Sequence, residues 1–133
     1  MKLKLLFVAL LYCAIGLGQT NEKITTLETV EVLNNNEEEA LYYFQNNWKK
    51  LREKAVEKGY IDSYQLLKTT YSDETPFHVL LVTTFANESQ FENRETHFQE
   101  LIKASGGLKL MNDKKPSEFR KSVFSVVGAK HLE

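Results

Sequence analysis

The chain has 133 residues, of which 17 are basic and 18 are acidic. This balance leaves no basic excess of the kind that nucleic-acid binding requires, and the length suits a single domain with its own core. Cys13 is the only cysteine, so the sequence excludes a disulfide framework and a thiolate metal site.

The first eighteen residues have the pattern of a cleaved secretory signal. Two lysines precede an apolar run at 5–17, and small residues suit a cut before Gln19. The run is shorter than the roughly 20 apolar residues that cross a bilayer. We therefore expect residues 1–18 to be removed and residues 19–133 to form one exported domain, periplasmic or extracellular. No membrane span is expected after cleavage.

The β-branched run at 24–33 predicts the first strand. A helix is expected to follow, capped by Asn36 with Glu39 in the position that a capping box requires, and to end at Gly59. Apolar residues recur along it at helical spacing; they are Leu41, Phe44, Trp48, Leu51 and Ala55. The charged residues between them, including Arg52, are expected to face water.

The second half of the chain predicts a hairpin, a helix and a last strand. Strands are expected at 60–71 and 77–85, joined by a turn that closes at Pro76. Asn87 is expected to cap the second helix, which ends at the two glycines 106 and 107. A connector, a turn of helix at 117–121 and a strand at 122–128 complete the chain.

The strand at 77–85 is apolar on both of its faces. A strand of this kind is typically covered on both sides. Two helices can cover only one face of a small sheet, so the other face needs a different cover. A second copy of the chain is the simplest candidate, and we expect a homodimer that pairs through the sheet.

The element order β-α-β-β-α-β predicts an α+β, ferredoxin-like fold, with an antiparallel sheet and two helices on one face. Together with the two-faced strand and the long helix that carries Trp48, this order resembles the dimeric α/β-barrel superfamily, which includes antibiotic-biosynthesis monooxygenase-like and stress-responsive barrel proteins. The resemblance implies a ligand cavity between sheet and helices. It rests on topology and pattern, and no catalytic residue is carried over from it.

Five side chains are candidates for a site. His78, at the start of a strand, is the candidate for acid–base catalysis. Trp48 and Tyr64 are candidates to line a cavity for a small, partly apolar ligand. Arg94 lies where the apolar face of the second helix should continue, as does Glu95, and His97 could share a helical edge with Arg94. Arg94 and His97 are therefore candidates to contact a polar group of that ligand. Each also has a purely structural interpretation, in the core, at a strand end or at the surface.

Metal and cofactor motifs are missing from the sequence. No H-x-H or H-E-x-x-H spacing occurs, and no glycine-rich phosphate loop precedes a helix. No metal and no cofactor are therefore predicted. Three functions stay open: a cofactor-independent monooxygenase-, isomerase- or cyclase-like enzyme or small-molecule binder, a non-enzymatic envelope or extracellular module, and a haem-binding relative that would use His97.

Overall fold

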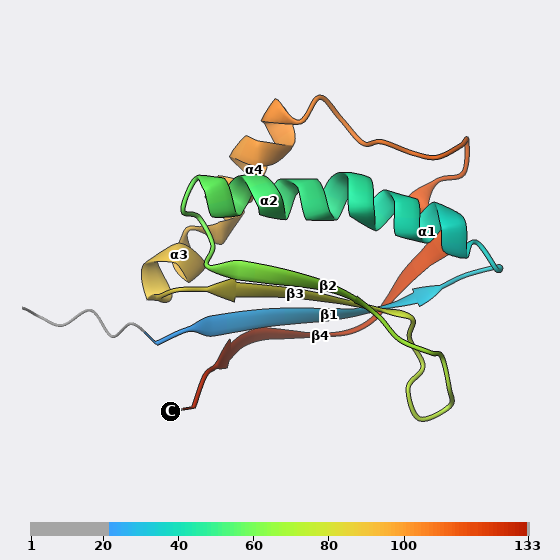
Figure 1. Cartoon of the computed structure of the whole chain (residues 1–133), viewed down its shortest axis with the longest axis horizontal. Helices are drawn as coiled ribbons and strands as arrows, with labels where there is room; N and C mark the ends of the chain where they lie inside the picture. Colours follow the sequence, from blue (N-terminus) through green and yellow to red (C-terminus); the bar gives the residue numbers. More distant parts are fainter. Residues whose placement is uncertain (1–21, 133) are drawn as a thin grey trace, which may run out of the picture.

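A computed structural model describes residues 22–132, so the predicted signal at 1–18 lies outside the described residues. Four strands form one antiparallel sheet in the order β2-β3-β1-β4 (Figure 1). They are β1 (Ile24–Val32), β2 (Ser63–Lys68), β3 (Val79–Phe85) and β4 (Arg120–Lys130). The predicted hairpin between the second and third strands is confirmed.

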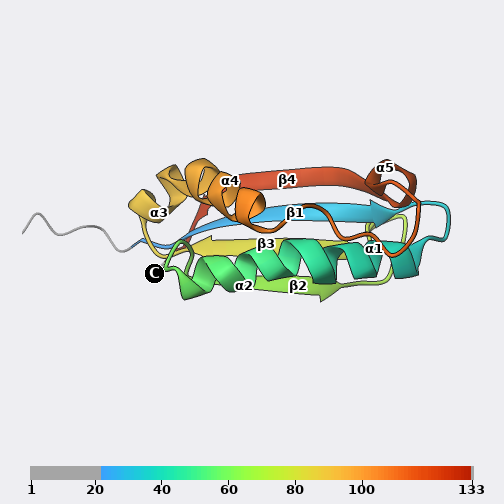
Figure 2. The same cartoon turned by 90° about the horizontal axis from the view of Figure 1, so that it is seen from above.

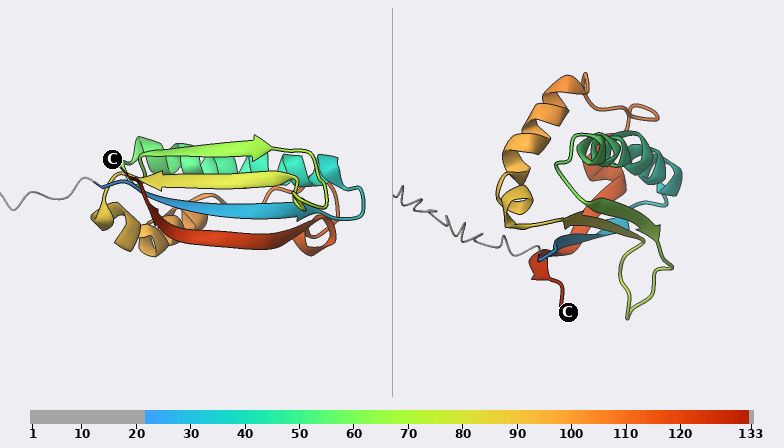
Figure 3. Two further views of the ribbon diagram at one scale, coloured as in Figure 1. Left: turned by 90° about the horizontal axis from the view of Figure 1, so that it is seen from below. Right: turned by 60° about the vertical axis from the view of Figure 1, so that its left-hand side comes forward.

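The helices lie on one face of the sheet. The first helical rod comprises α1 (Glu37–Tyr43), η1 (Phe44–Trp48) and α2 (Lys49–Glu57). In space it lies along β2 and β3 (Figure 2). The second comprises α3 (Glu88–Glu92) and α4 (Arg94–Ala104), and α5 (Pro116–Phe119) precedes β4. Seen from below, the other face of the sheet carries no helix (Figure 3). The predicted ferredoxin-like fold is confirmed.

Three buried clusters hold the helices on the sheet. Phe44 packs with Val30, Val79 and Leu81 under the first rod. A second cluster joins both rods to β3, and its buried members are Ala55, Ile61, Phe85 and Leu101. Phe119 of α5 closes the third cluster with Val32 and Ala40. The apolar stripe predicted for the first helix therefore faces the core.

The first helix is not α-helical throughout, which the sequence interpretation missed. Over Phe44–Trp48 it widens into a π-turn, where the amide of Lys49 bonds to the carbonyl of Phe44 five residues back. Asn46 and Asn47 donate side-chain hydrogen bonds to the carbonyls of Tyr42 and Tyr43, at 2.8 and 2.9 Å. These amides supply donors where the backbone ladder is widened.

The predicted orientation of Arg52 was wrong. Arg52 lies four residues after Trp48 and three before the buried Ala55, so it borders the apolar stripe. Its side chain turns from the expected wet side toward the sheet, where it donates to Thr83 of β3.

The last strand is longer than predicted. It spans Arg120–Lys130 rather than 122–128 and pairs only with β1. Its register shifts twice, and the second irregularity places Gly128 at a positive φ of 80° under the ring of Phe91. The preceding helical turn is correspondingly shorter, because Arg120 already pairs with Val32. The second strand is shorter than predicted and spans Ser63–Lys68.

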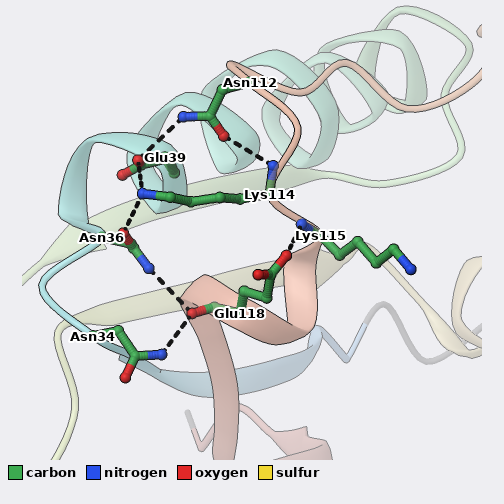
Figure 4. A network of polar contacts seen from close by, with 7 residues as sticks. All are labelled: Asn34, Asn36, Glu39, Asn112, Lys114, Lys115 and Glu118. Carbon is green, nitrogen blue, oxygen red and sulfur yellow. Dashed lines mark hydrogen bonds and ion pairs between the residues drawn. The ribbon is translucent and has the colours of Figure 1, made fainter.

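The capping box predicted at Asn36 was also wrong. The Asn36 side chain makes no cap hydrogen bond and is used across the fold instead (Figure 4). Its Nδ2 donates to the carbonyl of Glu118, and its Oδ1 accepts from Lys114 at 2.7 Å. Lys114 also pairs with Glu39 at 2.6 Å. This polar network fixes the connector before α5 to the start of α1. The predicted cap at Asn87 is confirmed, because its Oδ1 accepts from the amide of Gln90.

The face of the sheet opposite the helices is apolar and partly open. The register places Leu67, Leu80 and Phe124 in one row across it, and Leu27, Val82 and Val126 in the next. Leu67 is 44% exposed and Phe124 is 48% exposed. The loop between β2 and β3 lies on this side of the sheet (Figure 1). The two-faced character expected of the third strand is therefore present.

Candidate functional site

A cavity of about 140 Å³ lies between the sheet and the first helical rod. Trp48 of η1 and Arg52 of α2 line it from the helical side, and residues of β1, β3 and β4 line it from the sheet. Its lining includes Trp48, Arg52, Glu28, Thr83 and Ser125. The cavity therefore combines one aromatic wall with a cation, a carboxylate and hydroxyl groups.

Arg52 is the central side chain of this cavity. Its guanidinium carbon lies 4.5 Å from the ring centroid of Trp48 and 4.1 Å from that of Phe98 on α4. Its Nε donates to Thr83 Oγ1 at 3.2 Å. Two cation–π contacts and one hydrogen bond fix the plane of the guanidinium. Within residues 22–132 no hydrogen bond engages the two Nη groups.

The environment of Arg52 is poorly solvated. Burial lowers the pKa of Arg52 to about 10, and the charge of nearby Glu28 opposes that shift. Among the described residues, no carboxylate oxygen lies within the 4.0 Å of an ion pair with this guanidinium. The positive charge is thus held in place without being neutralised by direct contact, which favours a ligand that brings a negative or strongly polar oxygen.

Glu28 lies on the same face of the sheet as the buried core residues of β1. Its register partners are Leu81 of β3 and Ser125 of β4, and its carboxylate accepts a hydrogen bond from Ser122. A carboxylate beside an apolar wall and a cation can accept a proton from a bound molecule. Glu28 and Arg52 are therefore the two groups of this cavity with acid–base and electrostatic chemistry.

Trp48 and Tyr64, both predicted from the sequence, are brought together. Their rings meet edge to face, with centroids 5.9 Å apart. Trp48 lines the cavity, whereas Tyr64 on β2 packs behind it and against the second core cluster.

His78 lies at the start of β3, away from the cavity. Its Nδ1 accepts the backbone amide of Val32 at 2.9 Å, its own amide donates to the carbonyl of Val30, and its ring stacks on Tyr71. These contacts hold the end of the strand in register.

Arg94 and His97 are placed outside the cavity as well. Arg94 donates to the carbonyl of Phe91 at 2.8 Å and stacks on that ring at 4.0 Å. His97 is stacked on Tyr60, with ring centroids 3.7 Å apart and planes 6° from parallel. Its Nδ1 is buried without a hydrogen-bond partner in the described structure. The structure therefore does not gather the sequence-predicted residues into one site.

Arg52, Glu28 and Thr83 are the cavity residues that sequence reasoning missed. Two signals in the sequence point to them. Glu28 and Thr83 are polar residues in the inward-facing register of otherwise apolar strands. The pair Asn46-Asn47 lies in the middle of a helix, where asparagine is unfavourable, and it marks the π-turn that precedes Arg52.

Two properties of the described residues bear on the kind of site. No group of three or more His, Cys, Asp and Glu side chains gathers there as a metal ion would require. No helix in residues 22–132 is long and apolar enough to cross a membrane.

Comparisons with known proteins gave structural matches only. No family model and no curated protein matches the sequence. HapK from Hahella chejuensis is 12% identical, with a TM-score of 0.50 over 82% of this chain and 92% of that one. A putative antibiotic biosynthesis monooxygenase from Nitrosomonas europaea is 11% identical, with a TM-score of 0.41 over 81% and 90% of the two chains.

A dimeric protein of unknown function from Bacteroides fragilis, described as having a ferredoxin-like fold, is also similar. It is 12% identical, with a TM-score of 0.41 over 79% of this chain and 95% of that one. At such identities the likeness concerns the fold. The strand order β2-β3-β1-β4, with both helical rods on one face of the sheet, is the ferredoxin-like fold predicted from the sequence.

Proposed function

We propose that this protein binds a small, partly apolar molecule in the cavity between β1, β3 and the first helical rod. The observation that supports this proposal most is the placement of Arg52. Its guanidinium is oriented by Trp48, Phe98 and Thr83, and its Nη donors remain for a carbonyl, enolate or carboxylate oxygen of a ligand. Trp48 supplies the apolar surface for the rest of that molecule.

The same two charged groups support a cofactor-independent reaction. Glu28 would take a proton from a carbon next to a ligand carbonyl. The electrons of that C–H bond would then form a C=C bond, and the negative charge would reach the carbonyl oxygen. Arg52 would stabilise this enolate electrostatically. Enolate formation of this kind is an opening step that isomerase-, cyclase- and monooxygenase-like reactions can share.

The first experiment is native mass spectrometry of the full chain after expression and purification from its host. We expect an additional small mass on the protein. This mass should be absent from Arg52→Met and present in the control variant Arg94→Met, which lies outside the cavity. Because Trp48 is the only tryptophan, its fluorescence should change when the identified compound is added back. Failure of both signals would contradict the proposal.

A second experiment separates an enzyme from a binder. The identified compound is incubated in deuterated water with wild type and with Glu28→Gln. Exchange of its acidic proton by wild type alone supports catalysis by Glu28. Binding without exchange in either protein supports the alternative of a non-enzymatic module. We propose no haem site, since His97 is stacked on Tyr60 and does not line the cavity.

We further propose that a second copy of the chain covers the open face of the sheet. Exposed apolar side chains of β2 and β4 on that face support this proposal. It predicts a dimer by light scattering at micromolar concentration, and a monomer would overturn it. Export is a separate proposal from residues 1–18. The intact mass of the protein from the exported fraction tests it, with a chain that starts at Gln19 as the expected result.

A further inference from the structure

A second and larger hollow lies outside the proposed ligand cavity, between α2 and α4. It has a volume of about 650 Å³, within the usual range of small-molecule sites, and shares no lining residue with the Arg52 cavity. The two helices pack against each other, and α4 rises beside α2 away from the sheet (Figure 3). The segment after α4 contributes Leu108 and Lys109 to the lining of this groove.

The inner surface of the groove is aliphatic. Leu51 and Leu101 form its floor, where they belong to the second core cluster. Ile102 is 47% exposed and Leu108 is 63% exposed along its sides. Exposed aliphatic side chains that converge on a hollow favour an aliphatic ligand. Binding of such a ligand would remove the apolar surface of these side chains from water.

The rim of the groove is predominantly basic. Lys50, Lys54, Lys58 and Lys109 line it, against two acidic residues in the same lining, Glu53 and Glu57. Lys50 and Lys54 pair with those glutamates in exposed i,i+3 contacts, which stabilise little and can be exchanged for a ligand. Lys58 pairs with Glu100 of α4 at 2.7 Å. Lys109 makes no ion pair within the described residues. The rim therefore complements a single negative charge.

The part of the groove wall that follows α4 is fixed by hydrogen bonds. The side chain of Asn47 accepts the amide of Lys109 and donates to the carbonyl of Lys109, both at 2.7 Å. This reciprocal pair fixes the segment that carries Leu108 to the π-turn. A preformed wall lowers the entropy lost on binding.

From these observations we propose that the groove between α2 and α4 binds an anionic amphiphile, with an aliphatic chain along Leu51, Ile102 and Leu108 and one carboxylate at the lysine rim. A neutral aliphatic molecule would leave the excess positive charge of the rim without a counter-charge. A small polar anion would leave the aliphatic floor in water.

The test uses the full-length chain and isothermal titration with dodecanoate below its micelle-forming concentration. Dodecyltrimethylammonium serves as the probe with the same chain and opposite charge. We expect dodecanoate to bind and the cation to bind at least about tenfold more weakly, the factor that corresponds to one charge-assisted contact. Equal binding of both probes would overturn the proposal.

Matched variants locate the site. Leu108→Ser should weaken dodecanoate binding by about tenfold, because one buried aliphatic contact is lost, whereas Leu132→Ser, which changes an almost fully exposed leucine, should not. Lys109→Ala should weaken binding of dodecanoate more than Lys103→Ala, since Lys103 does not line the groove. No effect of Leu108→Ser and Lys109→Ala would overturn the proposal.

A last comparison separates this site from the Arg52 cavity. Arg52→Met should bind dodecanoate as wild type does. Loss of dodecanoate binding in Arg52→Met, with Leu108→Ser unaffected, would place the amphiphile in the Arg52 cavity and refute the groove. The groove proposal and the cavity proposal can therefore fail independently.

Discussion

The guanidinium of Arg52 on α2 rests on the ring of Phe98 on α4, with 4.1 Å between the guanidinium carbon and the ring centroid. One contact thus joins the two helical rods above the sheet and orients the cation of the cavity. Because Phe98 also packs against the second core cluster, the position of the charge depends on the packing between the rods.

Replacement of Arg52 by methionine should separate binding from stability. Methionine keeps the aliphatic stem but removes a poorly solvated charge, so the free energy of unfolding should change by no more than about 1 kcal/mol. Urea denaturation measures this change, and ligand binding should be lost in the same variant. A loss of stability above about 2 kcal/mol would instead assign Arg52 a structural role.

Replacement of His78 by alanine should destabilise the fold. The amide of Val32 would lose its acceptor, and an unsatisfied buried donor costs about 1–3 kcal/mol. The exposed His131 is the control, and His131→Ala should change stability by less than about 0.5 kcal/mol. If His78→Ala unfolds like wild type but abolishes turnover of the identified ligand, the acid–base interpretation of His78 holds instead.

Stability should depend on pH through Glu100. Hydrogen bonds from Lys58 and Tyr60 hold the pKa of Glu100 below its usual value, and the same bonds raise the pKa of Lys58 and of Tyr60. The carboxylate stabilises the fold above its unfolded pKa, and this contribution is lost as pH falls through the lowered folded pKa. The Lys58 and Tyr60 contributions are present below their unfolded pKa values and are lost as pH rises through the raised ones.

Glu100→Gln should therefore be less stable than wild type at neutral pH, and the difference should vanish in acid and in strong base. Thermal unfolding across pH measures it. Glu95→Gln, an exposed change on the same helix, should follow the wild-type profile. A constant difference between Glu100→Gln and wild type at every pH would contradict this linkage.

Replacement of Leu67 by aspartate should disrupt the proposed dimer. Leu67 is 44% exposed on the open face of the sheet, and a carboxylate there would be buried without a partner in the dimer interface. Val56 on α2 is 41% exposed and lies away from that face, so Val56→Asp is the matched control. Light scattering should give a monomer for Leu67→Asp and a dimer for Val56→Asp; dimers from both would place the interface elsewhere.

Replacement of Lys114 by methionine should loosen the connector between α4 and α5. Lys114 bonds to both Asn36 and Glu39 (Figure 4), whereas the neighbouring Lys115 contributes backbone groups, its amide and its carbonyl, which both bond to Glu118. Hydrogen exchange of residues 105–115 should accelerate in Lys114→Met and stay unchanged in Lys115→Met. Equal exchange in both variants would show that other contacts hold the connector.

Sequence patterns predicted the fold because its elements follow local rules. The stripe through Phe44 and Ala55, the cap at Asn87 and the stop at Gly59 each follow from residue type and spacing, and each is present. The role of the Asn36 side chain was mispredicted. Its Oδ1 accepts a hydrogen bond from Lys114 instead of from the first turn of the helix, and local spacing does not reveal a partner so distant in the chain.

The cavity was less predictable for a different reason. Arg52 borders the predicted stripe, four residues after Trp48, and helical spacing alone does not tell whether such a residue faces water or the sheet. Glu28 became interpretable only once its register against Leu81 was known. Candidate side chains chosen by residue type, such as His78 and His97, were instead found in contacts that need no ligand.

The π-turn also bears on how such a protein can change over time. Removal of a single codon, for example that of Asn46, would replace the π-turn by an α-turn and rotate every later residue of the rod by about 100° around the helix axis. Arg52 would leave the cavity, and Ala55 would leave the core in the same step. Gain or loss of one codon here would therefore change the charge of the cavity and the packing of the core together, so descendants of one gene could exchange this chemistry only with compensating changes in the core.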